Sequence, residues 1–166
     1  MIHHTNSTTS QIIKILEDWG CWFETFEHGP VRTSEEAAKV RSGYSLKQGA
    51  KAMLVKVKLR TNETKYMMLV LPGDLRFDKA KVKQLYDAKD FGMATEDEVR
   101  EITKGVEPGG VPPFGNLFNI EIIADPKLFE NEKIIFNAGS KSFSIAMMSS
   151  DYKDIVNPKI LPISLN

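Results

Sequence analysis

A short stretch rich in glycine and proline constrains the fold of this chain more than any other. It contains three glycines and two prolines in seven consecutive residues: Gly109, Gly110, Val111, Pro112, Pro113, Phe114 and Gly115. Proline fixes its φ angle and has no N–H to donate, whereas glycine adopts conformations that a Cβ forbids. The stretch therefore cannot continue a helix or lie inside a central strand. We expect a stiff loop whose bare amides suit a small molecule or a nucleotide end, with a purely structural turn as the alternative.

The second constraint is the position of Lys51 at the start of a predicted strand. One face of this strand carries apolar residues and the other carries basic ones, namely Met53, Val55, Val57 and Leu59 against Lys56, Lys58 and Arg60. Because side chains alternate along a strand, a strand that begins at Lys51 places this lysine on the apolar face. A lysine there must reach water or lose hydration at a free-energy cost, so Lys51 is a functional candidate. If the strand begins at Ala52 or later, Lys51 is an ordinary loop residue.

Length and composition indicate one soluble domain. The chain has 166 residues, of which 42% are hydrophobic and 27% charged, enough for a substantial core. Its formal net charge of zero argues against a broad basic surface for nucleic acid, although not against binding the end of an RNA. The single cysteine, Cys21, lies among apolar residues and indicates an inert thiol in a reducing compartment. The sequence has no membrane-length apolar run and no secretory signal. We expect a cytoplasmic protein that does not associate with membranes, with residues 1–8 as a flexible tail.

Periodicity and turn signals predict short helices and strands in mixed order. Helices are expected over residues 9–19, 33–40, 77–86, 95–103 and 150–156, with Thr33 and Thr95 as caps and with Val82 and Leu85 facing the core. Strands are expected over residues 21–27, 51–60, 65–71, 119–124, 133–137 and 142–148, the second and third forming a hairpin. The order lacks strict βαβ alternation, so the pattern predicts an α+β fold.

Familiar catalytic motifs are absent from the sequence. No GxGxxG follows a predicted strand, and neither a phosphate-binding GxxxxGKS/T nor a GxSxG motif occurs. No pair of His or Cys residues has metal-ligand spacing, and His28 stands alone. We therefore expect no cofactor and no metal. An enzyme with this sequence would act by positioning its substrate and by backbone electrostatics.

Four segments occur in a characteristic order, over residues 28–38, 49–55, 109–115 and 136–140. They read HGPVRTSEEAA, GAKAMLV, GGVPPFG and FNAGS. Together they resemble the YbaK/prolyl-tRNA-synthetase-associated domain family, the trans-editing aminoacyl-tRNA deacylases. The resemblance implies an α/β domain with a mixed, barrel-like sheet and helices packed outside. It also implies hydrolysis of the ester between a wrong amino acid and the terminal adenosine of a tRNA, commonly the tRNA for proline.

The resemblance also implies site residues and partners. Lys51 matches the functional lysine of the family, and Gly110 and Gly139 are expected to supply catalytic amides. Substrate contacts are expected from Gly109, Val111, Pro112, Pro113, Phe114, Gly115, Asn137, Ala138, Ser140 and His28. The expected partners are the acceptor end of an aminoacyl-tRNA and, beyond it, a synthetase, and we expect a free-standing domain. The oligomeric state is not readable from the sequence.

A mechanism follows from these assignments. Backbone amides would stabilise charge on the ester carbonyl oxygen, Lys51 would orient the substrate end or the attacking water, and a ribose hydroxyl would assist the water. Met53, Phe114 and Phe136 would line the pocket or belong to the core. A basic cluster would hold phosphates or form a solvated strand face, namely Lys47, Lys56, Lys58 and Arg60.

Two features leave the substrate open. Lys141 and Ser144 stand where some family members carry a histidine and an aspartate, so the edited amino acid is not defined. His28 could instead be a turn residue that hydrogen-bonds locally. Two other functions fit the same residues: a non-catalytic module that binds aminoacyl-tRNA or a synthetase, and a hydrolase of a small ester or nucleotide.

Overall fold

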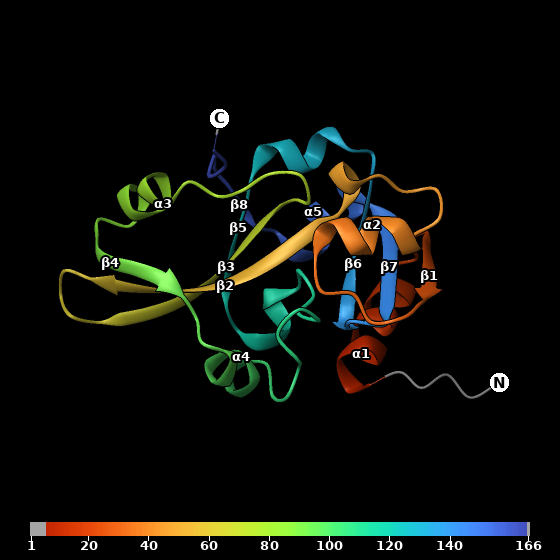
Figure 1. The fold of residues 1–166 in the computed structure, drawn as a ribbon, viewed down its shortest axis with the longest axis horizontal. Helices are drawn as coiled ribbons and strands as arrows, with labels where there is room; N and C mark the ends of the chain where they lie inside the picture. Colours follow the sequence, from red (N-terminus) through yellow and green to blue (C-terminus); the bar gives the residue numbers. More distant parts are fainter. Residues whose placement is uncertain (1–5, 166) are drawn as a thin grey trace.

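Strands β1 to β8 form two separate sheets in the computed structural model, which describes residues 6–165 (Figure 1). The three-stranded sheet has the order β1-β7-β6, made of Phe23–Glu27, Phe143–Met148 and Lys133–Ser140. The five-stranded sheet has the order β4-β2-β3-β5-β8, made of Ala88–Met93, Ala50–Leu59, Thr64–Pro72, Glu121–Ala124 and Lys159–Ile160. It contains both parallel and antiparallel pairs. The predicted mixture of helices and mixed sheet is confirmed.

The expectation of one barrel-like sheet is corrected. Within residues 6–165, the two sheets join only through an isolated parallel bridge between Gly49 and Ile135. The hydrogen-bonded ladder therefore does not close into a barrel. The junction of the two sheets lies at the start of β2, beside Lys51.

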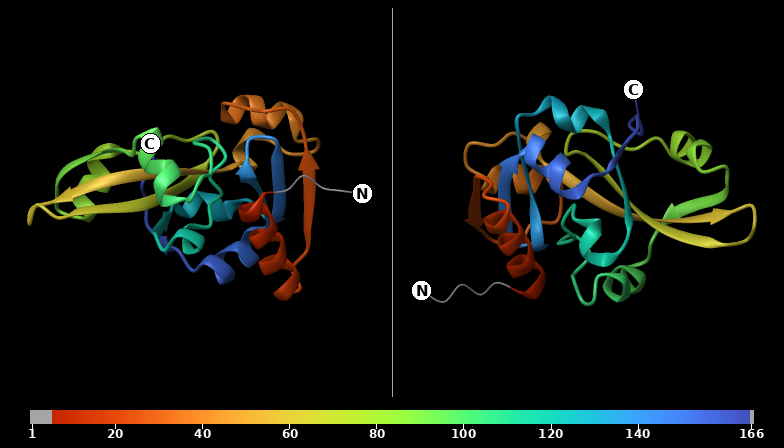
Figure 2. Two further views of the ribbon diagram at one scale, coloured as in Figure 1. Left: turned by 90° about the horizontal axis from the view of Figure 1, so that it is seen from below. Right: turned by 180° about the vertical axis from the view of Figure 1, so that it is seen from behind.

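The predicted hairpin of β2 and β3 is confirmed and forms the longest arm of the molecule. Lys51 pairs with Leu71 and Met53 with Leu69, and Asn62 takes a left-handed conformation in the turn. The hairpin projects away from the three-stranded sheet in both further views (Figure 2). Because β2 begins at Ala50, Lys51 lies within the strand rather than in the preceding loop.

The hairpin is buried on two faces where it enters the body of the protein. One core cluster packs Leu54 with Ile12, Phe136 and other residues of the three-stranded sheet side. A second cluster packs Val55 and Val57 with neighbours that include Ile163. The predicted pattern, with one apolar and one solvent-exposed face, therefore applies only to the outer half of β2. In the inner half of the strand, both faces pack against other parts of the protein.

Helices α1 and α2 begin at polar caps. Helix α1 spans Ser7–Asp18, and the Asn6 side chain accepts a hydrogen bond from the Thr9 amide at 2.9 Å. Residues 1–5 of the expected flexible tail lie outside the described residues, while Ser7 and Thr8 belong to the first turn of α1, which corrects that part of the expectation. Helix α2 spans Ser34–Val40, with Thr33 as the predicted cap.

The middle of the chain differs from expectation in two places. Helix α3 spans Lys79–Leu85 and buries Val82, but Leu85 is 42% exposed because the helix ends there, before Asp87 turns the chain. Strand β4 was not predicted, although it pairs with β2 across Phe91 and Val57. Helix α4, Glu96–Ile102, carries the predicted cap at Thr95.

Two remaining segments complete the fold. Helix α5 spans Ser149–Val156 and follows β7 directly, and β8 then adds to the edge of the five-stranded sheet.

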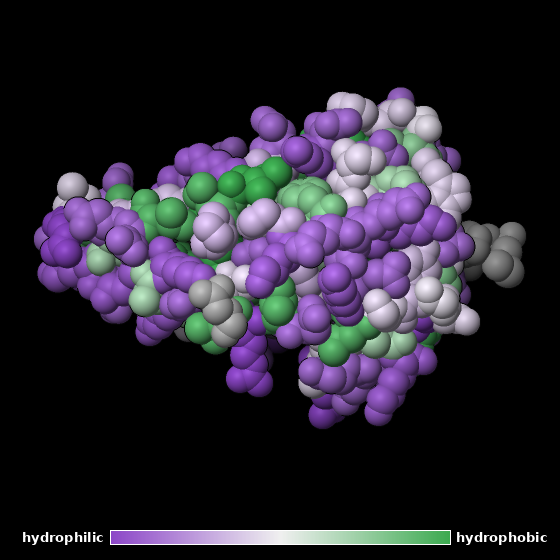
Figure 3. All heavy atoms as spheres, turned by 90° about the horizontal axis from the view of Figure 1, so that it is seen from above, coloured by the Kyte–Doolittle hydropathy of each residue, from purple (hydrophilic) through white to green (hydrophobic). Residues whose placement is uncertain are grey.

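No helix within residues 6–165 combines the length and the apolar character needed to cross a bilayer. Hydrophilic side chains cover most of the face shown in Figure 3, where apolar side chains lie in separate patches.

Candidate active site

A pocket of about 150 Å³ lies at the junction of the two sheets. Its walls come from the start of α2, the 3₁₀ turn Leu46–Gln48, the first residues of β2, the glycine-proline loop and β6. The pocket brings together four of the predicted site residues: Lys51, Gly109, Val111 and Asn137. The predicted functional lysine and the predicted loop therefore face one cavity although 58 or more residues separate them in sequence.

Lys51 presents an unpartnered ammonium to this pocket. No residue within 6–165 forms a hydrogen bond or an ion pair with its Nζ, and the side chain is half-buried. Burial lowers the pKa of Lys51, Glu35 and Asp74 act in the opposite direction, and Arg76 lowers it further. A half-buried cation without a partner is suited to binding a polar or anionic group of a ligand.

Arg41 is a pocket residue that the sequence did not single out. It follows the last residue of α2, is only 7% exposed, and lines the pocket. Its Nε donates to Ser144 Oγ at 3.0 Å, and its Nη2 donates to Asn137 Oδ1 at 2.9 Å. Burial lowers the pKa of Arg41 to about 10, so the guanidinium remains charged at neutral pH.

Asn137 connects Arg41 to the glycine-proline loop. Its Oδ1 accepts from Arg41, and its Nδ2 donates to the Gly109 carbonyl at 2.8 Å. Gly109 has a φ of +88°, a conformation that disfavours other residues, and it lies against the Lys141 side chain. The pocket-lining end of the loop is thus held by Asn137 of β6, which is itself held by Arg41.

His28 and Ser144 extend the same hydrogen-bond network. His28 Nε2 lies 2.8 Å from Ser144 Oγ, and His28 Nδ1 lies 2.8 Å from the Gly29 carbonyl. Since that carbonyl only accepts, Nδ1 carries a proton. His28 does not line the pocket, so its contacts support Ser144 and Arg41 rather than reach the cavity directly.

The second half of the glycine-proline loop is structural. Pro112, Pro113, Phe114 and Gly115 are buried. The Tyr152 hydroxyl donates to the Pro113 carbonyl at 2.6 Å, and the Phe114 ring packs on Phe136. Phe114 and Phe136 belong to the core rather than to the pocket wall, and Met53 packs against the second core cluster. The residues of the loop that line the pocket are therefore Gly109 and Val111.

The two amides expected to stabilise the carbonyl oxygen are already used. The Gly110 amide donates to the Glu107 carbonyl at 2.9 Å, and the Gly139 amide donates to the Gly110 carbonyl at 2.9 Å. The second of these bonds joins the loop to β6, where a Cβ on Gly110 would lie 3.1 Å from the Ser140 backbone. By contrast, no residue within 6–165 accepts from the amides of Gly109 or Val111, and both residues line the pocket.

Ala138 and Ser140 lie on β6 outside the pocket. The Ala138 carbonyl accepts a hydrogen bond from Thr9 Oγ1 at 2.6 Å, and Ser140 Oγ accepts from the Ser142 amide at 3.0 Å. Both therefore fix the strand end and its turn.

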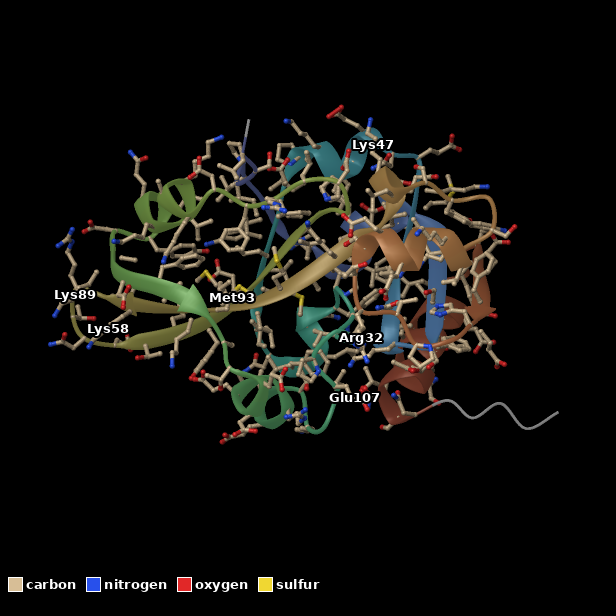
Figure 4. The ribbon with its side chains drawn as sticks, in the orientation of Figure 1. Arg32, Lys47, Lys58, Lys89, Met93 and Glu107 are labelled. Carbon is tan, nitrogen blue, oxygen red and sulfur yellow. The ribbon has the colours of Figure 1, made fainter. Side chains whose placement is uncertain are left out.

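The four basic residues expected near Lys51 do not form one cluster. Lys56 pairs with Glu98 at 3.1 Å and Arg60 with Asp87 at 3.0 Å. Figure 4 shows Lys47 beside the pocket end of β2 and Lys58 on the distant hairpin arm, whereas Arg32 lies on the pocket side of the molecule. Within the described part of the chain, no group of three His, Cys, Asp or Glu side chains could hold a metal ion.

Comparisons with known proteins agree with this fold. The aminoacyl-tRNA editing domain family matches residues 28–155. The chain is 31% identical over 155 residues to the multifunctional Ser/Thr-tRNA deacylase ProXp-y of Escherichia coli strain K12, covering 93% of this chain and 91% of that protein. It is 38% identical over 99 residues to a proline–tRNA ligase of Bacillus licheniformis, of which it covers 16%.

A solved structure shares the whole fold. It belongs to a candidate trans-editing enzyme for prolyl-tRNA synthetase and superposes with a TM-score of 0.81 at 20% identity, covering 98% of this chain and 99% of that one. A likeness at this identity shows the fold, and the sequence matches show the family. The chain therefore belongs to the aminoacyl-tRNA editing domain family, as the resemblance predicted, and to the class of aminoacyl-tRNA deacylases.

Proposed function

We propose that this protein hydrolyses the ester between a small, wrongly attached amino acid and the terminal adenosine of tRNA for proline. The observation that carries the proposal is the pocket that joins the unpartnered Lys51 ammonium to Gly109, Val111 and Asn137. The similarity to a Ser/Thr-tRNA deacylase supports serine and threonine as the first amino acids to test. The solved relative linked to prolyl-tRNA synthetase supports tRNA for proline as the first tRNA.

The mechanism needs an attacking water and a place for the charge that develops on the carbonyl oxygen. Water adds to the ester carbon, the bond to the ribose oxygen breaks, and the free amino acid and the ribose hydroxyl are released. The free amides of Gly109 and Val111 would donate to the carbonyl oxygen as its negative charge grows. Lys51 would hold the aminoacyl-adenosine end, and a ribose hydroxyl of the substrate would assist the water.

Selection would rest on the size and polarity of the pocket. A pocket of about 150 Å³ favours a small amino acid, and its walls carry several hydroxyl and amide groups, namely Thr33, Ser34, Ser45 and Asn137. Polar groups that pair with a substrate hydroxyl discriminate more strongly than one methylene in an apolar pocket, which contributes only about 1–3 kcal/mol. We therefore expect seryl- and threonyl-tRNA to be better substrates than alanyl-tRNA.

The decisive experiment is deacylation of seryl-, threonyl- and alanyl-tRNA for proline by the wild type and by Lys51→Ala. We expect Lys51→Ala to lower the rate by about 10²-fold, because a positioning contact in the reaction is lost. Lys58→Ala is the matched control, since Lys58 lies on the same strand but is exposed and distant from the pocket.

Two outcomes would contradict the proposal. Full activity of a folded Lys51→Ala protein would remove the lysine from the mechanism. Tight binding of tRNA without hydrolysis of any substrate would indicate a non-catalytic binding module.

A further inference from the structure

Arg41 is a buried cation without a counter-charge. It is 7% exposed, and burial alone accounts for the lowering of its pKa, so no carboxylate among the described residues offsets its charge. Both of its hydrogen-bond partners, Ser144 and Asn137, are neutral. Burying a charge without a counter-charge costs free energy. Stabilisation of the fold therefore does not by itself explain why this guanidinium is buried.

The guanidinium is fixed on two sides and open on the third. Its Nε and Nη2 donate to Ser144 and Asn137, whereas no residue within 6–165 accepts from Nη1. Nη1 lies beside Gly49, where an added Cβ would be 3.5 Å away, and Arg41 and Gly49 both line the pocket. A donor held in place by its neighbours and left open toward a cavity is preorganised for a ligand.

We propose that Nη1 of Arg41 is the binding site for an anionic oxygen of the substrate. This inference rests on the proposed function and adds a residue to its pocket. Two oxygens of an aminoacyl-tRNA end carry negative charge: the carbonyl oxygen as water attacks the ester, and the phosphodiester of the terminal nucleotide. Either oxygen would give the buried guanidinium the counter-charge that the protein itself does not supply.

Depth in the pocket favours the carbonyl oxygen. Arg41 is buried, Lys51 is half-buried and Arg32 is exposed, so burial decreases in this order among the three cations that line the pocket. The aminoacyl group is the terminus of the substrate and enters first, whereas the phosphodiester follows it. Arg41 would thus meet the ester, and Lys51 and Arg32 would meet the backbone of the nucleotide chain.

Two variants test the proposed anion site at Arg41, and each changes a different residue of the pocket. Arg41→Gln removes the charge, and we expect it to lower kcat by about 10²-fold, as loss of one oxyanion donor does. Gly49→Ser keeps the guanidinium but places a hydroxyl within reach of Nη1, and we expect about a tenfold loss, the equivalent of one hydrogen bond. Gly92→Ser is the matched control, because nothing lies within 4 Å of a Cβ at that position.

The readouts are kcat and KM for deacylation, together with calorimetric binding of adenosine 5′-monophosphate compared with adenosine. A fall in kcat with unchanged KM and nucleotide binding assigns the carbonyl oxygen. A rise in KM with loss of the monophosphate's advantage over adenosine assigns the phosphodiester. Wild-type values for both measurements in folded Arg41→Gln overturn the proposal, and so do wild-type values in Gly49→Ser if Arg41→Gln does not fold. If the wild type deacylates no substrate, the proposed function fails, and nucleotide binding alone then decides the anion site.

Discussion

The side chain of Asn137 hydrogen-bonds to both Arg41 and the glycine-proline loop. Replacing Asn137 by Asp keeps the first of these bonds and removes the second. The carboxylate of Asn137→Asp would still accept from Arg41 but could no longer donate to the Gly109 carbonyl. We expect deacylation to slow by about tenfold, because one hydrogen bond that positions the loop is lost. We expect the melting temperature to hold or rise, because the buried guanidinium gains a counter-charge.

Steady-state kinetics measure the expected loss of deacylation rate, and thermal unfolding measures the change in melting temperature. Asn116→Asp serves as the control, since Asn116 is exposed and follows the same loop. An Asn137→Asp protein with the wild-type rate would show that the bond to Gly109 does not position the loop.

Single residues differ in how far the sequence reveals them. The alternation of β2 pointed to Lys51, because a strand period of two is a local property. Arg41 gave no such signal: it stands at the end of a short helix before Ser42 and Gly43, where a basic residue is ordinarily exposed. Its burial depends on Asn137 and Ser144, which follow 96 and 103 residues later. Contacts over such separations cannot be derived from local pattern.

The expected amide donors illustrate the same limit. Gly110 and Gly139 matched the motifs, but the Gly110 amide donates to the nearby Glu107 carbonyl and the Gly139 amide donates to the Gly110 carbonyl. Which amides stay free depends on how the loop packs against β6, and the sequence does not contain this information locally.

At the scale of elements, the best predicted helices and strands are those whose ends are marked by a local sequence motif, such as a helix cap or a polar turn. Helix α4 has a Thr95–Glu98 capping box, and the β2–β3 hairpin has two apolar strands around a polar turn. Strand β4 lacks such signals, since its sequence mixes two charged residues with a glycine. It is a strand because it pairs with β2, so its state comes from tertiary structure.

Glu98 ties α4 to the hairpin and makes the stability of this part depend on pH. Its pKa is about 2, below the ordinary 4.5, because the Thr95 backbone amide and then Tyr66 and Lys56 donate to its carboxylate. A folded pKa below the unfolded one means that the stabilisation is complete above pH 4.5 and is lost as pH falls toward 2.

We therefore predict that Glu98→Gln lowers the melting temperature at pH 7 and that the difference from wild type shrinks between about pH 5 and pH 2. Thermal unfolding across this range measures the effect. Glu101→Gln is the control, because Glu101 is exposed on the same helix. A constant difference at all pH values would show that Glu98 acts by packing rather than by charge.

At the scale of the whole molecule, the pocket lies where the two sheets meet. The bridge between Gly49 and Ile135 brings the start of β2 to β6, and α2 closes the pocket from outside. The family motifs predicted the walls from β2, the loop and β6, but not that the sheets stay separate. Separate sheets leave a junction between them, and the cavity lies at this junction.

Asp125 joins the C-terminal segment to the five-stranded sheet. This carboxylate is 1% exposed, and its Oδ2 accepts from the amides of Ile163 and Ser164 at 2.9 Å each. Ile163 is fully buried and belongs to the second core cluster, together with residues of the five-stranded sheet. Ile163 and Ser164 are therefore part of the core.

Asp125→Ala leaves the buried amides of Ile163 and Ser164 without acceptors, and each unsatisfied group costs about 1–3 kcal/mol. We predict that the free energy of unfolding falls by about 3 kcal/mol in urea denaturation, while the folded fraction keeps its deacylation activity because Asp125 does not line the pocket. Asp154→Ala is the control, since Asp154 is exposed and its replacement should change stability by less than about 0.5 kcal/mol. Equal stability of the two variants would show that the C-terminal segment contributes no cooperative contact to the core.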